Sequence, residues 1–211
     1  MGGAAREAWL PELQSGLTRM GIRLDTHQCD KLIAFLLLLE KWNRVFNLTA
    51  IRDPSRMVSR QLLDSLSVLP YLKGPRVLDV GTGPGLPGVP LAVAQPGLDF
   101  VLLDSNGKKT RFVQQACVEL GLNNIDVVRC RIEEFHPVHP FDTVTSRAFT
   151  ALPRMYALTA RLIAAGGHLL AMRGKVPPEE IEQLSHGEKP IEVIPLRFPG
   201  SDGERHAVLI G

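Results

Sequence analysis

Residues 77–88 read Val-Leu-Asp-Val-Gly-Thr-Gly-Pro-Gly-Leu-Pro-Gly, a short apolar run with an acid, followed by four glycines. The four residues from Val77 to Val80 are typical of a buried strand. Glycines directly after a strand let the backbone turn sharply and come closer to a ligand than any side chain would permit. This stretch therefore predicts a strand that leads into a ligand-binding loop.

The glycines of this loop fit two known binding patterns. The dinucleotide pattern G-x-G-x-x-G is fitted by Gly83, Gly85 and Gly88, and the pattern G-x-G-x-G is fitted by Gly81, Gly83 and Gly85. Asp79, two residues before the first glycine, favours the second pattern. So does Pro87, which stands where a dinucleotide fold would begin its pyrophosphate-binding helix. A P-loop is excluded because no Lys-Ser or Lys-Thr pair follows Gly88.

A second apolar run narrows the ligand to one that contains adenosine. Residues 99–104 read Asp-Phe-Val-Leu-Leu-Asp, which predicts a buried strand closing on an acid about 20 residues after the glycine loop. The Asp104 carboxylate is placed to accept hydrogen bonds from both ribose hydroxyls. NAD and S-adenosylmethionine share that ribose, so Asp104 does not choose between them. The alternative is an acid that only caps the following helix.

Alternating strands and helices after residue 73 predict an α/β fold with a doubly wound sheet. We expect strands near 77–80, 99–104, 125–130, 141–146, 167–173, 191–197 and 205–210. Only a short loop joins the last two, so they should form an antiparallel hairpin. Seven strands ending in such a hairpin describe the Rossmann-like class I S-adenosylmethionine-dependent methyltransferase fold. A dinucleotide dehydrogenase would need a further substrate domain, for which no residues remain.

The chain before about Leu72 has the periodicity of helices. Thr26 is expected to cap a helix that runs to about Phe46, and a second helix is expected from Ser55 to Leu69. We therefore predict a helical extension over residues 1–72, packed on a methyltransferase unit over residues 73–211. The apolar stripe of the first helix is read as core packing, with a partner-binding face as the alternative.

Composition places the chain among ordinary globular enzymes, with 211 residues, 45% hydrophobic and 22% charged. Its three cysteines have no paired spacing and no histidine at ligand distance, and His136 and His139 have no partner at ligand spacing. We expect a cytoplasmic protein without a metal. The longest apolar run, 32–39, is too short to span a bilayer, so no membrane association is expected.

Three motifs together resemble one family. They are the glycine loop from Leu78, the run Leu-Leu-Asp-Ser-Asn-Gly-Lys-Lys-Thr-Arg-Phe at 102–112, and Ser-Arg-Ala-Phe at 146–149. The sequence is similar to the bacterial small-subunit ribosomal RNA guanine-N7 methyltransferases, also called the glucose-inhibited division protein B family. The likeness begins at about Leu38 and includes the runs 47–51 and 63–66. Departures are Gln61 in place of His, Leu86 in place of Phe and Arg173 in place of Lys.

The resemblance and the fold imply S-adenosylmethionine as the cofactor. The residues expected to bind it are Asp79, Gly81, Gly83, Gly85, Leu86, Asp104, Ile132, Glu133 and Arg147. In this fold the turn after the third strand passes the adenine, so Ile132 is expected to pack on the ring and the backbone at Ile132 and Glu133 to bond its edge. Glu133 can equally favour a helix first turn.

Cations recur just after the predicted strands, where open parallel sheets bind their ligands. They are Lys108 and Lys109, Arg131, Arg147, and Arg173 with Lys175, while Arg52, Arg56 and Arg60 belong to the helical extension. A cofactor with a positively charged sulfur does not require so many cations around it, whereas the phosphates of RNA are bound by Lys and Arg. We predict RNA contacts by Lys108, Arg131 and Arg173. Solvated surface charge is the alternative for each of them.

The stretch after the fourth strand indicates the accepting atom. No cysteine lies there for attack on a pyrimidine, and Ser146-Arg147 replaces the acceptor loop of exocyclic-amine methyltransferases. Guanine N7 loses no proton, and arginine reads its O6 edge. Arg147 is therefore the predicted catalytic residue, with Phe149 stacking on the base. We expect a monomer acting on 16S ribosomal RNA of the small subunit. Another methyl acceptor, or a binding module without chemistry, remains the alternative.

Overall fold

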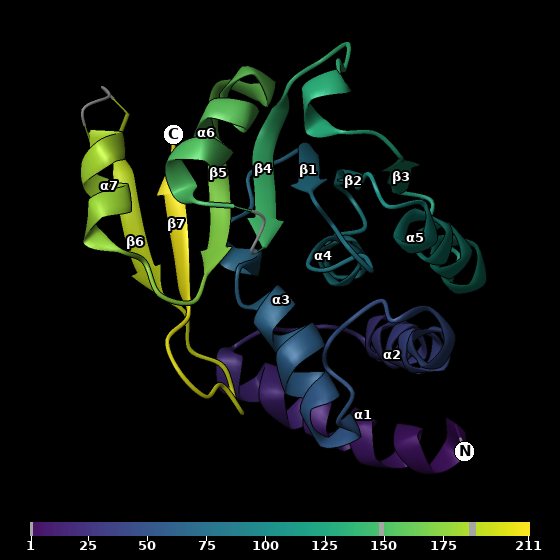
Figure 1. The fold of residues 1–211 in the computed structure, drawn as a ribbon. Coiled ribbons are helices and arrows are strands. Elements are labelled where there is room, and N and C mark those ends of the chain that lie inside the picture. The colour runs from purple at the N-terminus through teal and green to yellow at the C-terminus, as the bar shows by residue number, and fades with distance from the viewer. Residues whose placement is uncertain (1, 148–149, 186–188) are drawn as a thin grey trace.

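A computed structural model describes residues 2–147, 150–185 and 189–211. The strands form one sheet in the order β3-β2-β1-β4-β5-β7-β6 (Figure 1). They are β1 (Arg76–Val80), β2 (Asp99–Leu103), β3 (Ile125–Val128), β4 (Phe141–Arg147), β5 (Ile163–Arg173), β6 (Ile191–Pro195) and β7 (His206–Ile210). Strands β1 to β5 pair in parallel, and β7 runs antiparallel to both of its neighbours. The seven strands and the C-terminal hairpin confirm the predicted fold class.

Strand order brings the predicted site together. Strand β1 lies between β2 and β4: β2 and β3 extend the sheet on one side of β1, and the strands from β4 onward extend it on the other side. Ligands of such sheets bind at the carboxyl ends of the strands where this reversal occurs. Asp79 of β1 is the register partner of Thr145 of β4. The glycine loop after β1 and Arg147 at the end of β4 therefore meet at one edge.

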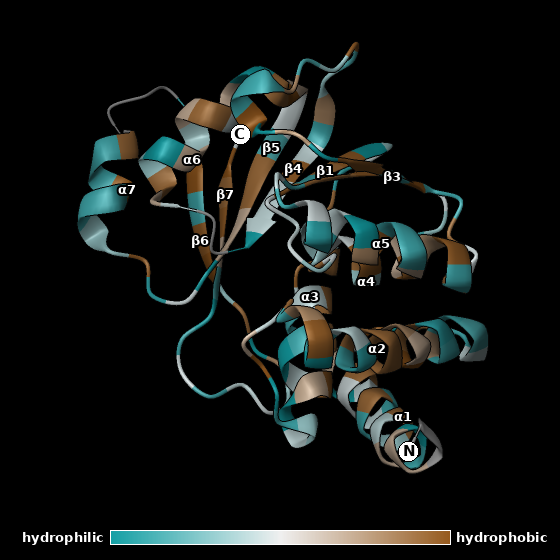
Figure 2. Cartoon of the chain, turned by 45° about the vertical axis from the view of Figure 1, so that its right-hand side comes forward, coloured by the Kyte–Doolittle hydropathy of each residue, from teal (hydrophilic) through white to brown (hydrophobic). Residues whose placement is uncertain are grey.

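Both faces of the sheet are covered by helices, which explains the continuous apolar runs of its strands. Val77 of β1 packs in one cluster with Leu91 of α4 (Gly88–Ala94), while its neighbour Leu78 packs in another with Met155 of α6 (Leu152–Thr159). The remaining covering helices are α5 (Gly107–Leu120) and α7 (Pro178–Ser185). Strands β5 and β7 are accordingly largely brown in Figure 2, whereas β4, with its threonines and serine, is paler.

The N-terminal helices pack on the face that carries α4 and α5 (Figure 1). They are α1 (Gly2–Met20) and α2 (Thr26–Phe46), followed by the short α3 (Asp64–Leu66). The rings of Phe35 in α2 and Phe112 in α5 lie 6.0 Å apart. One apolar cluster thus runs from the helical extension into the methyltransferase unit. None of the helices in the described part of the chain is long and apolar enough to cross a membrane.

Two details of the extension correct the sequence predictions. The cap of α2 is Asp25, not Thr26: Asp25 has extended backbone and accepts from the Gln28 amide at 2.7 Å, while the Gln28 side chain accepts from the Asp25 amide at 2.9 Å. These two reciprocal hydrogen bonds form a capping box, which Thr26 cannot form because it lies inside the helix.

The segment predicted as one helix from Ser55 to Leu69 is a series of short turns. A 3-10 turn over Pro54–Arg56 precedes a π-helix over Val58–Leu63, then α3, then a 3-10 turn over Leu69–Tyr71. Apolar periodicity does not distinguish these turn types, because all of them bury the same side of the segment. Wide turns of the π type are rare and frequently lie at functional sites, and this one faces β4.

Candidate active site

The glycine loop after β1 has a backbone that only glycine adopts freely. Gly81, Gly83 and Gly85 have φ angles of +67°, +59° and +86°. The amides of Gly81 and Thr82 donate to the Leu103 carbonyl at 2.8 and 3.1 Å, which ties the loop to the end of β2. Gly88 is needed for a different reason, because a Cβ there would lie 1.9 Å from Leu102 Cδ2.

Asp79 supports this loop from below. Its side chain is fully buried, and Oδ2 accepts hydrogen bonds from Thr82 Oγ1 at 2.6 Å and from the Gly88 amide at 2.9 Å. Burial raises the pKa of this carboxyl to about 6, against the lowering effect of the two hydrogen bonds. Its Oδ1 has no partner in the described part of the chain. Asp79 fixes the shape of the loop, and the direct cofactor contact predicted for it stays a prediction.

Asp104, at the end of β2, lines a cavity of about 550 Å³ beside the loop. Its Oδ2 accepts from the Gly83 amide at 2.9 Å and its Oδ1 from the Asn106 amide at 2.8 Å. Each oxygen keeps a lone pair for a ligand hydroxyl. The predicted site residues that line this cavity are Gly81, Gly83, Leu86, Asp104, Arg131, Ile132, Glu133 and Arg147, whereas Asp79, Gly85 and Lys108 do not line it.

The turn after β3 forms the opposite wall. Ile132 is 5% exposed and begins a 3-10 turn over Ile132–Glu134. The Ile132 carbonyl accepts from the Phe135 amide at 3.2 Å and from Arg161 Nη2 at 2.6 Å, so hydrogen bonds to an adenine edge would come from amide groups of this turn. An apolar wall, a fixed carboxylate and a cavity of ordinary ligand size fit S-adenosylmethionine.

A second cavity of about 690 Å³ adjoins the first and is rich in arginine. Its arginines are Arg52, Arg56, Arg60, Arg147, Arg173 and Arg205, and its acids are Asp53 and Asp64. Thr49 and Arg147 line both cavities. We call this second one the arginine cavity. It brings together cations from the extension and from the ends of strands that are far apart in the sequence.

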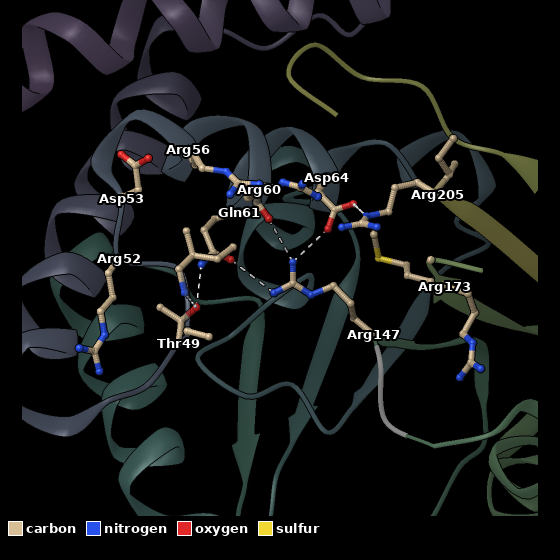
Figure 3. Close-up of a pocket in the computed structure, with 15 residues that line it drawn as sticks. Thr49, Arg52, Asp53, Arg56, Arg60, Gln61, Asp64, Arg147, Arg173 and Arg205 are labelled. Atoms are coloured by element: carbon tan, nitrogen blue, oxygen red, sulfur yellow. Dashed lines mark hydrogen bonds and ion pairs between the residues drawn. The ribbon is translucent and has the colours of Figure 1, made fainter. Parts of the chain in front are cut away.

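Arg147 lies between the two cavities and is held there by residues 54–71 of the extension, which we call the irregular segment (Figure 3). Its Nη1 donates to the Arg60 carbonyl at 3.3 Å and to Asp64 Oδ2 at 3.2 Å, and its Nη2 donates to Gln61 Oε1 at 3.4 Å. Gln61 is fully buried and donates to Thr49 Oγ1 at 3.0 Å. Three acceptors thus fix the direction of the guanidinium.

Sequence reasoning assigned no role to Asp64 or Thr49 and treated Gln61 only as a departure from the family. Asp64 is 5% exposed and lies within 3.6 Å of Arg205 as well as bonding Arg147. The sequence signal is weak, because residues 57–69 mix polar and apolar side chains and Asp64 and Gln61 do not stand out among them. Buried polar side chains of this kind need partners, and the partner here is a predicted catalytic residue.

The other predicted cations are placed differently from one another. Arg173 lines the arginine cavity but bonds Glu180 of α7 at 3.2 Å and the Thr150 carbonyl at 2.5 Å. Lys108 is exposed in the first turn of α5, while its neighbour Lys109 lines the first cavity. Phe149, the expected stacking residue, lies outside the described residues. In the described residues, no group of three or more His, Cys, Asp or Glu side chains gathers at metal-binding distance.

Comparison with known proteins decides the family. Residues 28–208 match the sequence model of rRNA small subunit methyltransferase G. The chain belongs to this family. It is 49% identical over 202 residues to the Ribosomal RNA small subunit methyltransferase G of Alkalilimnicola ehrlichii, which covers 96% of this chain and 92% of that protein. The protein of the same name from Chromobacterium violaceum is 50% identical over 198 residues, covering 93% and 95%.

Solved structures agree on the fold of this family member. An S-adenosylmethionine-dependent methyltransferase from Aquifex aeolicus superposes with a TM-score of 0.54 over 75% of this chain and 93% of that one, at 22% identity. The resemblance drawn from the glycine loop and the Ser-Arg-Ala-Phe motif is therefore confirmed, and so is the methyltransferase fold.

Proposed function

We propose that this protein transfers a methyl group from S-adenosylmethionine to N7 of a guanine in 16S ribosomal RNA. The observation that carries the proposal is the position of Arg147, which lines both the glycine-loop cavity and the arginine cavity. A methyltransferase needs one pocket for the donor and one for the acceptor, with a short path between them. The names of the family relatives, which specify ribosomal RNA of the small subunit, support the substrate class.

The first cavity holds the cofactor in this proposal. S-adenosylmethionine supplies an electrophilic methyl group on a sulfonium sulfur. Asp104 accepts from the ribose hydroxyls while Gly83 and Asn106 keep its carboxylate in place. Ile132 packs on the adenine, and the glycines let the backbone approach the ligand. The roles of Gly81, Gly85, Leu86 and Glu133 belong to the same proposal.

Arg147 orients the guanine. The nucleophile is the N7 lone pair, which attacks the methyl carbon as the carbon–sulfur bond breaks and sulfur keeps the electron pair. No proton leaves N7, so no general base is required. Arg147 donates to guanine O6, which leaves N7 free. The product ring is cationic, and Asp64, which pairs with Arg147, limits repulsion between the guanidinium and that ring.

Positioning supplies most of the rate in this scheme. Well-oriented partners can gain about 7–11 kcal/mol from proximity alone. The guanine must leave its stack to reach the cavity, which favours loops and single-stranded segments as substrates. Lys108, Arg131 and Arg173 contact RNA phosphates in this proposal. We further propose a monomeric cytoplasmic enzyme without a metal, in which extension 1–72 completes the acceptor pocket of unit 73–211.

The test uses small ribosomal subunits from cells that lack the protein. They are incubated with radiolabelled S-adenosylmethionine, digested to nucleosides and separated by chromatography. Label in 7-methylguanosine supports the proposal; label in another nucleoside, or none while the cofactor still binds, contradicts it. Arg147→Ala should abolish the label, and Arg6→Ala, which removes an exposed arginine ion-paired with Asp30, should leave it unchanged.

A further inference from the structure

Two arginines of the arginine cavity pair with an acid that does not line it. Asp202, in the loop between β6 and β7, bonds two of its arginines at once. Its Oδ2 lies 2.8 Å from Arg56 Nη2, and its Oδ1 forms an ion pair with Arg60 Nη2. The Asp202 side chain is 65% exposed, whereas that of Arg60 is 11% exposed. A surface acid therefore pairs with two cations of the irregular segment.

Other arginines of the cavity already have internal acids. Arg147 pairs with the buried Asp64, and Arg173 pairs with Glu180. Arg60 has other arginines nearby: burial lowers its pKa, Arg205 and Arg56 lower it further, and Asp64 raises it. The acid that pairs directly with Arg56 and Arg60 is Asp202, whose side chain faces solvent. RNA, a polyanion, can compete with the single Asp202 carboxylate for these cations.

We propose that Arg56 and Arg60 form a binding site for a phosphate of the RNA strand next to the target guanine, and that Asp202 occupies this site until RNA displaces it. This inference rests on the proposed function, because it assumes that the arginine cavity receives RNA. The two carboxylate oxygens of Asp202 bond one arginine each, and a phosphodiester of RNA presents its two non-bridging oxygens in the same way with the same single negative charge.

The loop is built so that Asp202 can leave without disturbing the core. Phe198, at the start of the loop, is 5% exposed and packs in the apolar cluster shared with the extension. Gly200 and Gly203 flank the acid with φ angles of +76° and +87°. A Cβ added at Gly203 would meet nothing within 4 Å, so this side of the loop has free space. Displacement of Asp202 breaks its ion pairs with Arg56 and Arg60 and the hydrogen bond that Arg60 Nη2 donates to its carbonyl at 3.3 Å, but the Asp202 side chain itself is 65% exposed.

Asp202→Asn tests the occupant, with Asp30→Asn as the matched control. Both changes remove one negative charge from an exposed Asp–Arg pair, but the Asp30 pair joins α1 and α2 away from the cavity. Binding of labelled 16S RNA and of small subunits is measured by filter retention over a series of salt concentrations. We expect Asp202→Asn to bind RNA about threefold more tightly and Asp30→Asn to bind as the parent does.

The double variant Arg56→Ala/Arg60→Ala tests the site itself. It should bind RNA about tenfold more weakly, and the slope of log affinity against log salt should fall by roughly 0.7–0.9, the value for one phosphate. The gain from Asp202→Asn should vanish in this background. A persistent gain would mean a general charge effect and would overturn the proposal. So would an unchanged slope, or an Asp202→Asn variant that binds RNA no better.

Failure of the proposed function would give a different pattern. RNA binding is measured separately from methyl transfer. If the wild-type protein yields no 7-methylguanosine, the variants can therefore still be compared for the expected changes in RNA affinity. A melting curve of Asp202→Asn tests whether the ion pair is purely structural. In that case the variant would have a lower melting temperature and no tighter RNA binding, which would refute the phosphate site.

Discussion

The buried acid beneath the glycine loop should make folding stability depend on pH in an unusual direction. Asp79 is fully buried, and its pKa is raised to about 6 in the folded protein from an ordinary 3.8. Between these values the folded chain holds a proton that the unfolded chain has released. Stability from this residue is therefore present at low pH and is lost as the pH rises toward 6, opposite to the usual behaviour of an ion-paired acid.

The size of the effect follows from the two pKa values. Their difference corresponds to about 3 kcal/mol between fully protonated and fully ionised Asp79. From pH 4 to pH 7 the free energy of unfolding should lose about 2.4 kcal/mol through this carboxyl. Other acids contribute with the opposite sign, since Asp53, for example, has its pKa lowered by hydrogen bonds from Ser55. The Asp79 contribution must therefore be isolated by comparison with a variant.

Asp79→Asn removes the titration and keeps an oxygen that can accept from Thr82 and Gly88. Urea unfolding of parent and variant is measured from pH 4 to pH 7, and the difference between their free energies is plotted against pH. We expect the variant to gain about 2.4 kcal/mol relative to the parent over this range, with most of the change below pH 6. A difference that does not change with pH would refute the reasoning and place the Asp79 pKa near its ordinary value.

Three further predictions concern the site. Arg147→Lys should lose methyl transfer by 100-fold or more, on the order of a lost positioning group, while cofactor affinity measured by calorimetry falls less; a fully active variant would exclude the orienting role. Asp104→Ala should weaken cofactor binding by about 10- to 100-fold, because charge-assisted hydrogen bonds to the ribose are lost; unchanged affinity in equilibrium dialysis would remove Asp104 from the site. Gly88→Ala should cost about 3 kcal/mol and lower the melting temperature by roughly 6–12 °C, because the added methyl overlaps a buried leucine, whereas the control Gly97→Ala, which has open space, should melt within about 2 °C of the parent.

Sequence patterns predicted the sheet well because each strand carries its own signal. Buried parallel strands are continuous apolar runs, and they end at glycines and acids that mark the following turn. The run 99–104 was predicted as a strand and is observed as Asp99–Leu103. The glycine loop and Asp104 followed from the same local logic, because both are fixed relative to the strand ends.

What escaped prediction depends on contacts between distant segments. Nothing near Asp64 in the sequence announces Arg147, which is 83 residues away and reaches it only through the order of the strands. The turn type of 54–71 was also missed, because π and α turns share the same apolar spacing. Lys108 was preferred to Lys109 as a ligand residue, and only the packing of α5 reveals that Lys109 lines the first cavity.

The irregular segment explains why a helical extension belongs to this enzyme. A regular helix over 55–69 would present side chains on one face at a spacing of 3.6 residues. Arg147 instead donates to acceptors from neighbouring positions: the backbone carbonyl of Arg60 and the side-chain oxygens of Gln61 and Asp64. These acceptors come from within and directly after the π-helix. The same segment also supplies Arg56 and Arg60 to the arginine cavity. If the proposed roles hold, residues 54–64 both aim Arg147 at the reacting base and provide the cations for the neighbouring phosphate, which would couple capture of the RNA strand to orientation of the guanine.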